Sequence, residues 1–235
     1  MQFQQFQNKH KGQRCFILGC APSLKKENLQ LLKDEIVLIC NKGFLAVKQL
    51  NLPKYDYFFC ADGVVYKELH KNFKQELDKI SVPRFYASKV AEVSKIDIKE
   101  DYVCYKRGYA DSIAVQNAGF PTNFEDGWGA TRGTVFDASI IAYWMGFNEI
   151  YLLGVDYDYS DKNNTHFYES GEREKLLVAE NKITDPNKKA FQRVIKTVAV
   201  IKNHLNKNGV VYKNLSKGFL HKNMMDTDTL ENIIK

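Results

Sequence analysis

Short apolar runs alternate along the chain with segments in which apolar residues recur every three or four positions. Each apolar run predicts a buried β-strand, and these runs occupy residues 15–18, 36–40, 57–61, 84–87, 102–105, 150–153 and 210–212. The helical patterns lie at 26–33, 43–50, 64–79, 135–145, 187–206 and 227–234. Such alternation is typical of βαβ units. It predicts an α/β fold with a mostly parallel sheet and helices on both faces.

Two segments depart from this rhythm. Residues 1–13 contain no apolar run, which predicts a loose polar N-terminal tail and not a secretory signal. Residues 14–235 are expected to form a single α/β domain. Within it, residues 156–186 are polar, charged and weakly periodic, directly after the strongest predicted strand. A long irregular insertion at the end of a strand is uncommon unless it is functional. We therefore predict a lid at about 157–186, with a surface excursion of no role as the alternative.

The composition limits which compartment, metal ions and partners are expected for the protein. The five cysteines form no CxxC pair, and their odd number disfavours a closed disulfide framework, so a reducing cytoplasm is expected. No zinc-ligand spacing occurs, and no apolar stretch approaches the roughly 20 residues needed to span a bilayer. The net charge of +6 comes from lysines spread along the chain, so no nucleic-acid partner is expected. Peripheral contact with an acidic membrane and homo-oligomer formation are left open.

The first candidate site is the turn after the first predicted strand, which contains Gly19, Cys20, Ala21, Pro22 and Ser23. The glycine lets the backbone turn tightly and approach a ligand. The proline and the serine suit the start of a helix, where N–H groups attract anions. Neither a dinucleotide fingerprint nor a Walker loop is present.

Polar residues recur at other strand ends. Asn41 follows the second predicted strand, Asp62 follows the third, and Asn214 and Ser216 follow the last. Because parallel strands end at one edge of a sheet, we expect these side chains to converge there and bind a base, a sugar or a hydroxyl group. The alternative is that each residue only forms a turn.

A further group surrounds the strongest strand. Arg132, Gly133 and Thr134 precede the helix predicted at 135–145, a place that suits a phosphate or a carboxylate. Gly154 and Asp156 end the strand at 150–153, and Asp156 begins the sequence Asp-Tyr-Asp. That pattern is similar to the metal motif of many sugar transferases, but no metal site is predicted from three residues alone.

His166 is the histidine best placed for catalysis, because it lies inside the predicted lid. An imidazole titrates near neutrality and can take a proton from an acceptor hydroxyl group. A structural role is the alternative. With Asp156 and Arg132, His166 completes the predicted catalytic set.

These segments resemble two related groups of proteins. The sequence GCAPSL, residues 19–24, is similar to the G-x-G-P-S-L turn of bacterial sialyltransferases and of the family typed by archaeal 6-hydroxymethylpterin diphosphokinase, which includes flagellin-glycosylation proteins. The segments ICNKGF and KNLS resemble their asparagine-containing strand ends. The most specific match is GTVFDASIIAYWMGFNEIYLLGVDY, residues 133–157, which resembles their G-[ST]-V helix followed by LGF-x-x-I-x-L-x-G-x-D.

The resemblance implies a modified Rossmann-type sheet with a lid insertion, and it makes the domain at 14–235 a nucleotide-binding one. It also implies a CMP-sugar donor, no required metal or other cofactor, and a histidine base. It places Tyr157 and Tyr159 near the donor phosphate. Two positions depart from the sialyltransferases: Cys20 replaces an asparagine that touches the nucleotide, and Ala21 replaces a glycine. Because a thiol is a poor hydrogen-bonding group, donor recognition is expected to differ.

The sequence therefore predicts a cytoplasmic glycosyltransferase of surface-glycan or glycoprotein assembly. Its partners would be a nucleotide-activated sugar, with a CMP-linked acidic sugar as the specific candidate, and a glycan or glycoprotein acceptor. The first alternative is an ATP-dependent pyrophosphokinase of the pterin type, in which Asp62, Asp156 and Asp158 would hold Mg²⁺. The second is a non-enzymatic module that binds nucleotides or glycans.

Overall fold

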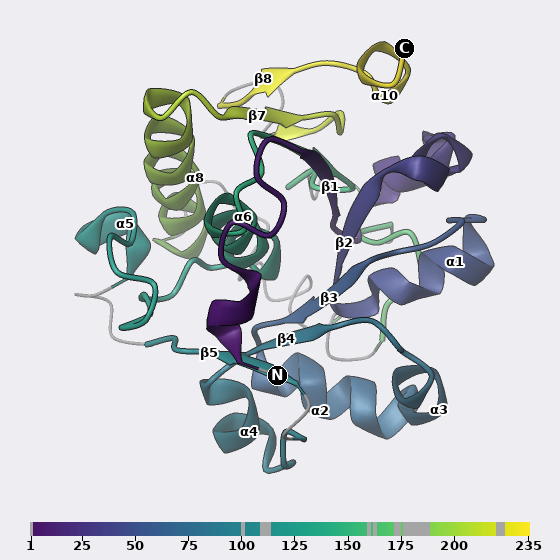
Figure 1. Ribbon diagram of the computed structural model, residues 1–235. Coiled ribbons are helices and arrows are strands. Elements are labelled where there is room, and N and C mark those ends of the chain that lie inside the picture. Colours follow the sequence, from purple (N-terminus) through teal and green to yellow (C-terminus); the bar gives the residue numbers. More distant parts are fainter. Residues whose placement is uncertain are drawn as a thin grey trace.

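The computed structural model describes residues 2–99, 102–108, 114–158, 161, 164–171, 175, 189–219 and 224–235. Its centre is one sheet in the strand order β5-β4-β3-β2-β1-β6-β7-β8, and every pair of neighbouring described strands is parallel (Figure 1). The strands are β1 (Arg14–Leu18), β2 (Ile36–Cys40), β3 (Tyr57–Cys60), β4 (Arg84–Ala87), β5 (Val103–Tyr105), β6 (Glu149–Leu153), β7 (Val211–Asn214) and β8 (Asp226–Thr227). The chain therefore has the α/β, Rossmann-like fold that its sequence predicts.

Helices cover both faces of the sheet (Figure 1). The α-helices are α1 (Leu45–Gln49), α2 (Gly63–Asn72), α3 (Lys74–Asp78), α4 (Lys89–Ser94), α5 (Val115–Ala118), α6 (Thr134–Trp144), α8 (Lys189–Lys207) and α10 (Leu230–Ile233). Short 3-10 helices are η1 (Phe3–Phe6), η2 (Pro22–Lys26), η3 (Leu29–Asp34) and η4 (Asn41–Phe44). Helix α6 contacts β1, β2, β3 and β6, whereas α2 packs on β3 and α4.

Each predicted strand is present, and the bounds differ by at most two residues at either end. The helix expected at 26–33 is instead the pair η2 and η3, and the one expected at 64–79 is split at Phe73 into α2 and α3. The sequence pattern did not reveal α4, α5 or the two-residue strand β8. These elements are too short to establish a periodicity, so packing decides them.

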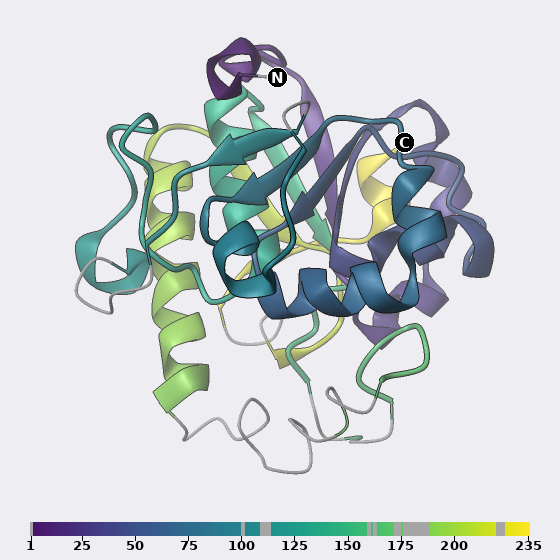
Figure 2. The ribbon, with the colours of Figure 1, turned by 90° about the horizontal axis from the view of Figure 1, so that it is seen from below.

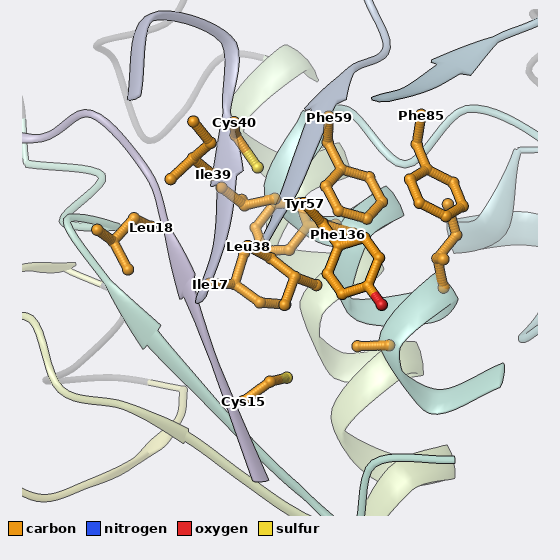
Figure 3. Close-up of a cluster of buried hydrophobic side chains, with 14 of the residues drawn as sticks. Cys15, Ile17, Leu18, Leu38, Ile39, Cys40, Tyr57, Phe59, Phe85 and Phe136 are labelled. Atoms are coloured by element: carbon orange, nitrogen blue, oxygen red, sulfur yellow. The ribbon is translucent and has the colours of Figure 1, made fainter. Parts of the chain in front are cut away.

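The core consists of strands whose side chains are buried on both faces. Phe16, Ile17, Val37, Leu38 and Phe58 have no measurable exposure. Figure 3 shows side chains from β1, β2, β3, β4 and α6 gathered into one cluster. In it the rings of Phe59 and Phe85 stack with centroids 4.7 Å apart. This burial explains why these strands read as unbroken apolar runs and do not alternate with polar residues.

The N-terminal segment is not the loose tail that its composition predicts. Phe3 and Phe6 are 8% and 3% exposed, and the Phe3 ring stacks on Trp144 with centroids 3.9 Å apart. The backbone of this segment also caps the end of α6, since Asn8 N–H donates to the Trp144 carbonyl and His10 N–H to that of Met145. Phe3 and Phe6, which stand among glutamines in the sequence, anchor this segment to the core. The segment (purple) lies at the top of Figure 2.

Within the described residues, no helix combines the length and the apolar character needed to cross a bilayer.

Candidate functional site

The turn after β1 lies directly against the end of β6. Gly19 N–H donates to the Leu153 carbonyl at 2.8 Å, and Ala21 N–H to that of Gly154 at 2.9 Å. A Cβ atom on Gly19 would lie 2.3 Å from the Gly154 oxygen, so this contact requires glycine. Gly154 itself has φ +65°, which also favours glycine. The turn after β1 and the end of β6 are therefore in direct contact and joined by backbone hydrogen bonds.

A buried serine–aspartate contact locks these strand ends together. Both Asp156 carboxylate oxygens are engaged, since Ser23 N–H donates to Oδ2 at 3.1 Å and Ser23 Oγ to Oδ1 at 2.5 Å. Asp156 is 6% exposed and Ser23 is 8% exposed. Burial raises the pKa of Asp156, and the two hydrogen bonds from Ser23 act in the opposite direction. Because Ser23 donates to both of its carboxylate oxygens, Asp156 holds the turn after β1 against the end of β6.

Asn41 and the start of α6 form the opposite wall. Asn41 occupies the left-handed backbone region with φ 54°, which asparagine tolerates better than most residues. Thr134 Oγ1 donates to Asn41 Oδ1 at 3.4 Å. A Cβ atom on Gly133 would lie 2.9 Å from the Tyr157 hydroxyl group, so that hydroxyl group packs against the start of the helix.

These walls enclose a cavity of about 230 Å³ at the edge where the strands end. Ten of the predicted site residues line it: Gly19, Cys20, Ala21, Asn41, Gly133, Thr134, Gly154, Asp156, Tyr157 and His166. The first residues of α6 are among them, so the positive end of the helix dipole faces the cavity. Together these features suit an anionic ligand such as a phosphate group.

His166 reaches the cavity because its neighbours are anchored. Phe167 N–H donates to the Cys20 carbonyl at 2.9 Å, and the Phe167 side chain is 4% exposed. His166 Nδ1 lies 3.0 Å from Ser170 Oγ and 3.1 Å from Thr165 Oγ1. The loop that contains these residues (green in Figure 2) lies at the opposite end of the strands from the N-terminal segment.

Asp62 does not belong to the cavity, contrary to the sequence-based prediction. Its carboxylate caps α2 by accepting from the Val64 and Val65 N–H groups at 2.7 and 3.2 Å. Orphan N–H groups at a helix start hold such a side chain where it is. Asp62 follows β3, and in the sheet β2 and β1 separate β3 from β6.

Asn214 and Ser216 do not line the cavity either. Asn214 Nδ2 donates to the Val155 carbonyl at 2.9 Å, and Ser216 Oγ accepts from Val155 N–H at 3.1 Å. Both side chains are fully buried. Their hydrogen bonds hold the Val155 backbone after β6, so they support the cavity wall without lining the cavity.

Pro22, Ser23 and Arg132 were also predicted to belong to the site, but they lie outside the cavity lining. Pro22 begins η2, where its fixed φ suits the first position of a helix. Arg132 has φ 69° and precedes α6, but Gly133 is the first residue of this segment to reach the cavity. Tyr159 lies outside the described residues, as does much of the lid predicted at 157–186.

The cavity also has lining residues that the predicted site did not include: Cys40, Val135, Val155, Thr165 and Asp158, the last of which was named only as an Mg²⁺ ligand in the pyrophosphokinase alternative. Each of them adjoins a predicted residue in the chain. Cys40 and Val155 are apolar residues at strand ends, which sequence reasoning assigned to the core. Adjacency to a polar strand end was the signal that would have found them.

Of the carboxylates proposed for Mg²⁺, Asp62 does not fit a metal ion shared with Asp156. Asp62 and Asp156 follow strands three positions apart in the sheet, a separation of roughly 14 Å at about 4.8 Å per strand. Ligands of one Mg²⁺ ion each lie about 2.1 Å from it. Asp62 and Asp156 also already accept hydrogen bonds from the protein. Among the described residues, no three His, Cys, Asp or Glu side chains are arranged to hold a metal.

A larger hollow of about 710 Å³ lies between the N-terminal segment, residues 122–125 and the end of α6. None of the predicted site residues lines it. It is thus distinct from the edge where open α/β sheets bind their ligands.

Replacing Ser23 by alanine tests how much the hydrogen bond from the Ser23 hydroxyl group to Asp156 stabilises the fold. We expect the free energy of unfolding to fall by about 1–3 kcal/mol, because a buried acceptor loses its donor. A folded pKa above the unfolded value means that stability falls as the pH rises through the folded pKa. Removing the Ser23 hydroxyl group raises the Asp156 pKa further, so the loss should be larger at pH 7 than at pH 3.

Urea denaturation at both pH values measures this effect. In an Asp156→Ala background, which removes the acceptor, the same serine replacement should cost little. Equal losses in the two backgrounds would show that Ser23 acts independently of Asp156.

Comparisons with known proteins agree with this fold. The sequence model of the family described as 6-hydroxymethylpterin diphosphokinase MptE-like matches residues 1–162. No curated protein sequence matches the chain significantly.

Several solved structures share the fold. The α-2,3-sialyltransferase Cst-I from Campylobacter jejuni aligns over 92% of this chain and 80% of its own, with TM-score 0.56 and 15% identity. The sialyltransferase CstII from the same organism, in complex with cytidine-5'-monophosphate, aligns over 92% and 84%, with TM-score 0.55 and 16% identity. The MAf glycosyltransferase from Magnetospirillum magneticum AMB-1 aligns over 98% of this chain with TM-score 0.54 and 16% identity, but the match spans only 37% of that longer protein.

Proposed function

The chain belongs to the 6-hydroxymethylpterin diphosphokinase MptE-like family, and we propose that it is a glycosyltransferase that uses a nucleotide-activated sugar. The observation that carries this proposal is the cavity where the turn after β1, Asn41, the start of α6 and His166 meet. The fold around it is shared with sialyltransferases, one of them in complex with CMP. The site thus combines a place for a nucleotide with a candidate base.

The phosphate of the donor is assigned to the start of α6. Gly133, Thr134 and Val135 line the cavity there, and the Tyr157 hydroxyl group packs beside them. Helix N–H groups and the helix dipole stabilise the charge that develops on a departing phosphate. The turn at Gly19–Ala21 lines the cavity and is assigned to the nucleotide, and the absence of a Cβ atom on Gly19 lets this turn pack against the end of β6.

His166 is assigned as the general base. The acceptor hydroxyl oxygen attacks the anomeric carbon and forms the new C–O bond. The bond between that carbon and the phosphate oxygen breaks, and the nucleotide leaves as a phosphate anion. Two hydroxyl groups hold His166 Nδ1, so Nε2 is the nitrogen assigned to take the acceptor's proton.

The specific donor proposed is a CMP-linked acidic sugar, and the acceptor a glycan or glycoprotein. Cys20 lines the cavity, and its thiol donates to the Cys40 carbonyl, so the contact that a sialyltransferase makes through asparagine is absent at this position. All five cysteines are free, which supports a reducing compartment and the cytoplasm as the place of reaction. The net charge of +6 supports acidic substrates or peripheral contact with an acidic membrane. A homo-oligomer is compatible with the proposal.

The family match favours a second candidate, an ATP-dependent diphosphokinase. That reaction requires Mg²⁺ between the phosphate groups and protein carboxylates. The mismatch of Asp62 and Asp156 described above supports the glycosyltransferase, which needs no resident metal ion in this proposal.

A thermal-shift screen with CMP, UDP, GDP and ATP, each with and without Mg²⁺, separates the candidates. We expect CMP to raise Tm without Mg²⁺, because binding to the folded state stabilises it by mass action. A shift produced only by ATP with Mg²⁺ would favour the diphosphokinase. Hydrolysis of a CMP-sugar by the protein would exclude a non-enzymatic module that only binds nucleotides or glycans.

A further inference from the structure

Lys42 is a buried cation beside the site that the proposed reaction leaves unused. The residue follows Asn41 directly in η4 and is 3% exposed. Its Nζ lies 2.6 Å from Glu68 Oε1 on α2. A lysine is almost never buried to this extent unless it is paired, so the position calls for a functional or structural reason.

The Lys42 ammonium group also lies against the segment that carries His166. Nζ is 4.8 Å from the centroid of the Tyr168 ring and 5.8 Å from that of Phe73. Both distances lie within the roughly 6 Å over which a cation is attracted to an aromatic face. The Tyr168 ring is 9% exposed, so little water screens this attraction.

Tyr168 in turn orients the candidate base. The His166 and Tyr168 rings stack with centroids 4.9 Å apart and planes 12° from parallel. The backbone next to His166 is also held, because Phe167 N–H donates to the Cys20 carbonyl. The histidine is therefore fixed between a backbone anchor on the β1 turn and a ring anchor on Lys42.

We propose that Lys42 is a positioning residue, which holds Tyr168 and, through it, the His166 ring at the cavity. This inference rests on the proposed function, because His166 matters to turnover only if it is the base. Glu68 supports the ammonium group, and α2 thereby contributes to a site that none of its side chains lines.

The first arm of the test needs no activity. In NMR spectra of the protein labelled at histidine, the stacked Tyr168 ring should shift the His166 ring protons upfield, and Tyr168→Leu should abolish that shift. Lys42→Met, which keeps the aliphatic stem and removes the charge, should move the His166 signals toward those of Tyr168→Leu. Lys74→Met is the matched control, since it removes an exposed lysine paired with Asp78 on α3. It should leave the His166 signals in place.

The second arm measures turnover with a CMP-sugar. Lys42→Met and Tyr168→Leu should each lower kcat by about 10²-fold, as a displaced catalytic group does, with KM for the donor changed by less than about twofold. The double variant should be no worse than either single variant, because both changes break one chain of contacts. Lys42→Arg, which keeps the charge, should restore part of the lost kcat.

The two arms distinguish failure of this inference from failure of the proposed function. His166 signals that stay in place in Lys42→Met would overturn the positioning role. Moved signals in a protein without transferase activity would uphold the positioning role and refute the glycosyltransferase. If Lys42→Met does not fold, Lys42→Arg carries both arms: because it keeps the charge, it should leave the His166 signals near those of the unchanged protein, and signals that move as far as in Tyr168→Leu would overturn the positioning role.

Discussion

Replacing His166 by alanine is expected to lower kcat by about 10²–10⁴-fold, the contribution typical of a general base. The affinity for CMP should stay near that of the unchanged protein. The reason is that the phosphate is assigned to the start of α6, which is a different part of the cavity lining from His166. The His166 side chain lines the cavity and contacts Thr165, Ser170 and Tyr168, whereas the turn that receives the nucleotide is contacted by the Phe167 backbone, which the substitution leaves in place.

Initial rates of CMP-sugar consumption and calorimetric titration with CMP measure the two effects separately. His70→Ala is the matched control, because His70 lies on α2 and does not line the cavity. It should leave both quantities unchanged. Full turnover in His166→Ala would refute the assigned role and direct attention to a base elsewhere in the predicted lid.

Replacing Gly19 by alanine is expected to have the second large effect. The added Cβ atom would lie 2.3 Å from the Gly154 oxygen and 3.0 Å from Val155 Cγ2, so the ends of β1 and β6 must separate. Such overpacking costs about 1–3 kcal/mol of unfolding free energy. The displaced atoms line the cavity, so CMP binding should weaken by about tenfold or more, which corresponds to roughly 1.4 kcal/mol.

Urea denaturation and titration with CMP test this prediction together. Gly209→Ala is the matched control, since Gly209 has φ +73° and open space around its Cβ position. It should lose about 1–2 kcal/mol from backbone strain alone, with CMP affinity unchanged. Equal CMP affinities in the Gly19 variant and the unchanged protein would contradict a nucleotide site at this turn.

Local residue pattern was enough to predict the strands and the position of most site residues. The runs at β1, β2 and β6 are apolar throughout, and each is followed by small or polar residues such as Gly19, Asn41 and Gly154. Parallel strands end at one edge, so these residues had to share an edge once the strands were recognised. Their gathering around one cavity followed from β2, β1 and β6 being neighbours in the sheet.

The same reasoning failed where the polar side chain bonds to the backbone instead of lining the cavity. Asp62, Asn214 and Ser216 are polar residues at strand ends like Asn41, and nothing in their spacing distinguishes them. Asp62 caps its own helix, and the other two hold the backbone of Val155. The prediction of a loose N-terminal tail was wrong for another reason. Phe3 and Phe6 pack into the hydrophobic core, on a surface that only the folded chain provides.

The sequence by itself determined seven of the eight described strands and the long helices α6 and α8, because the periodicity of burial is a property of neighbouring residues. It also determined that glycine, asparagine and serine stand where strands end. Only the tertiary structure decided the order of strands, which brings β6 beside β1 and leaves β3 two strands away from β1. That order is set by packing between residues far apart in the chain, and it is what separates Asp62 from Asp156 and joins Lys42 to the segment that carries His166.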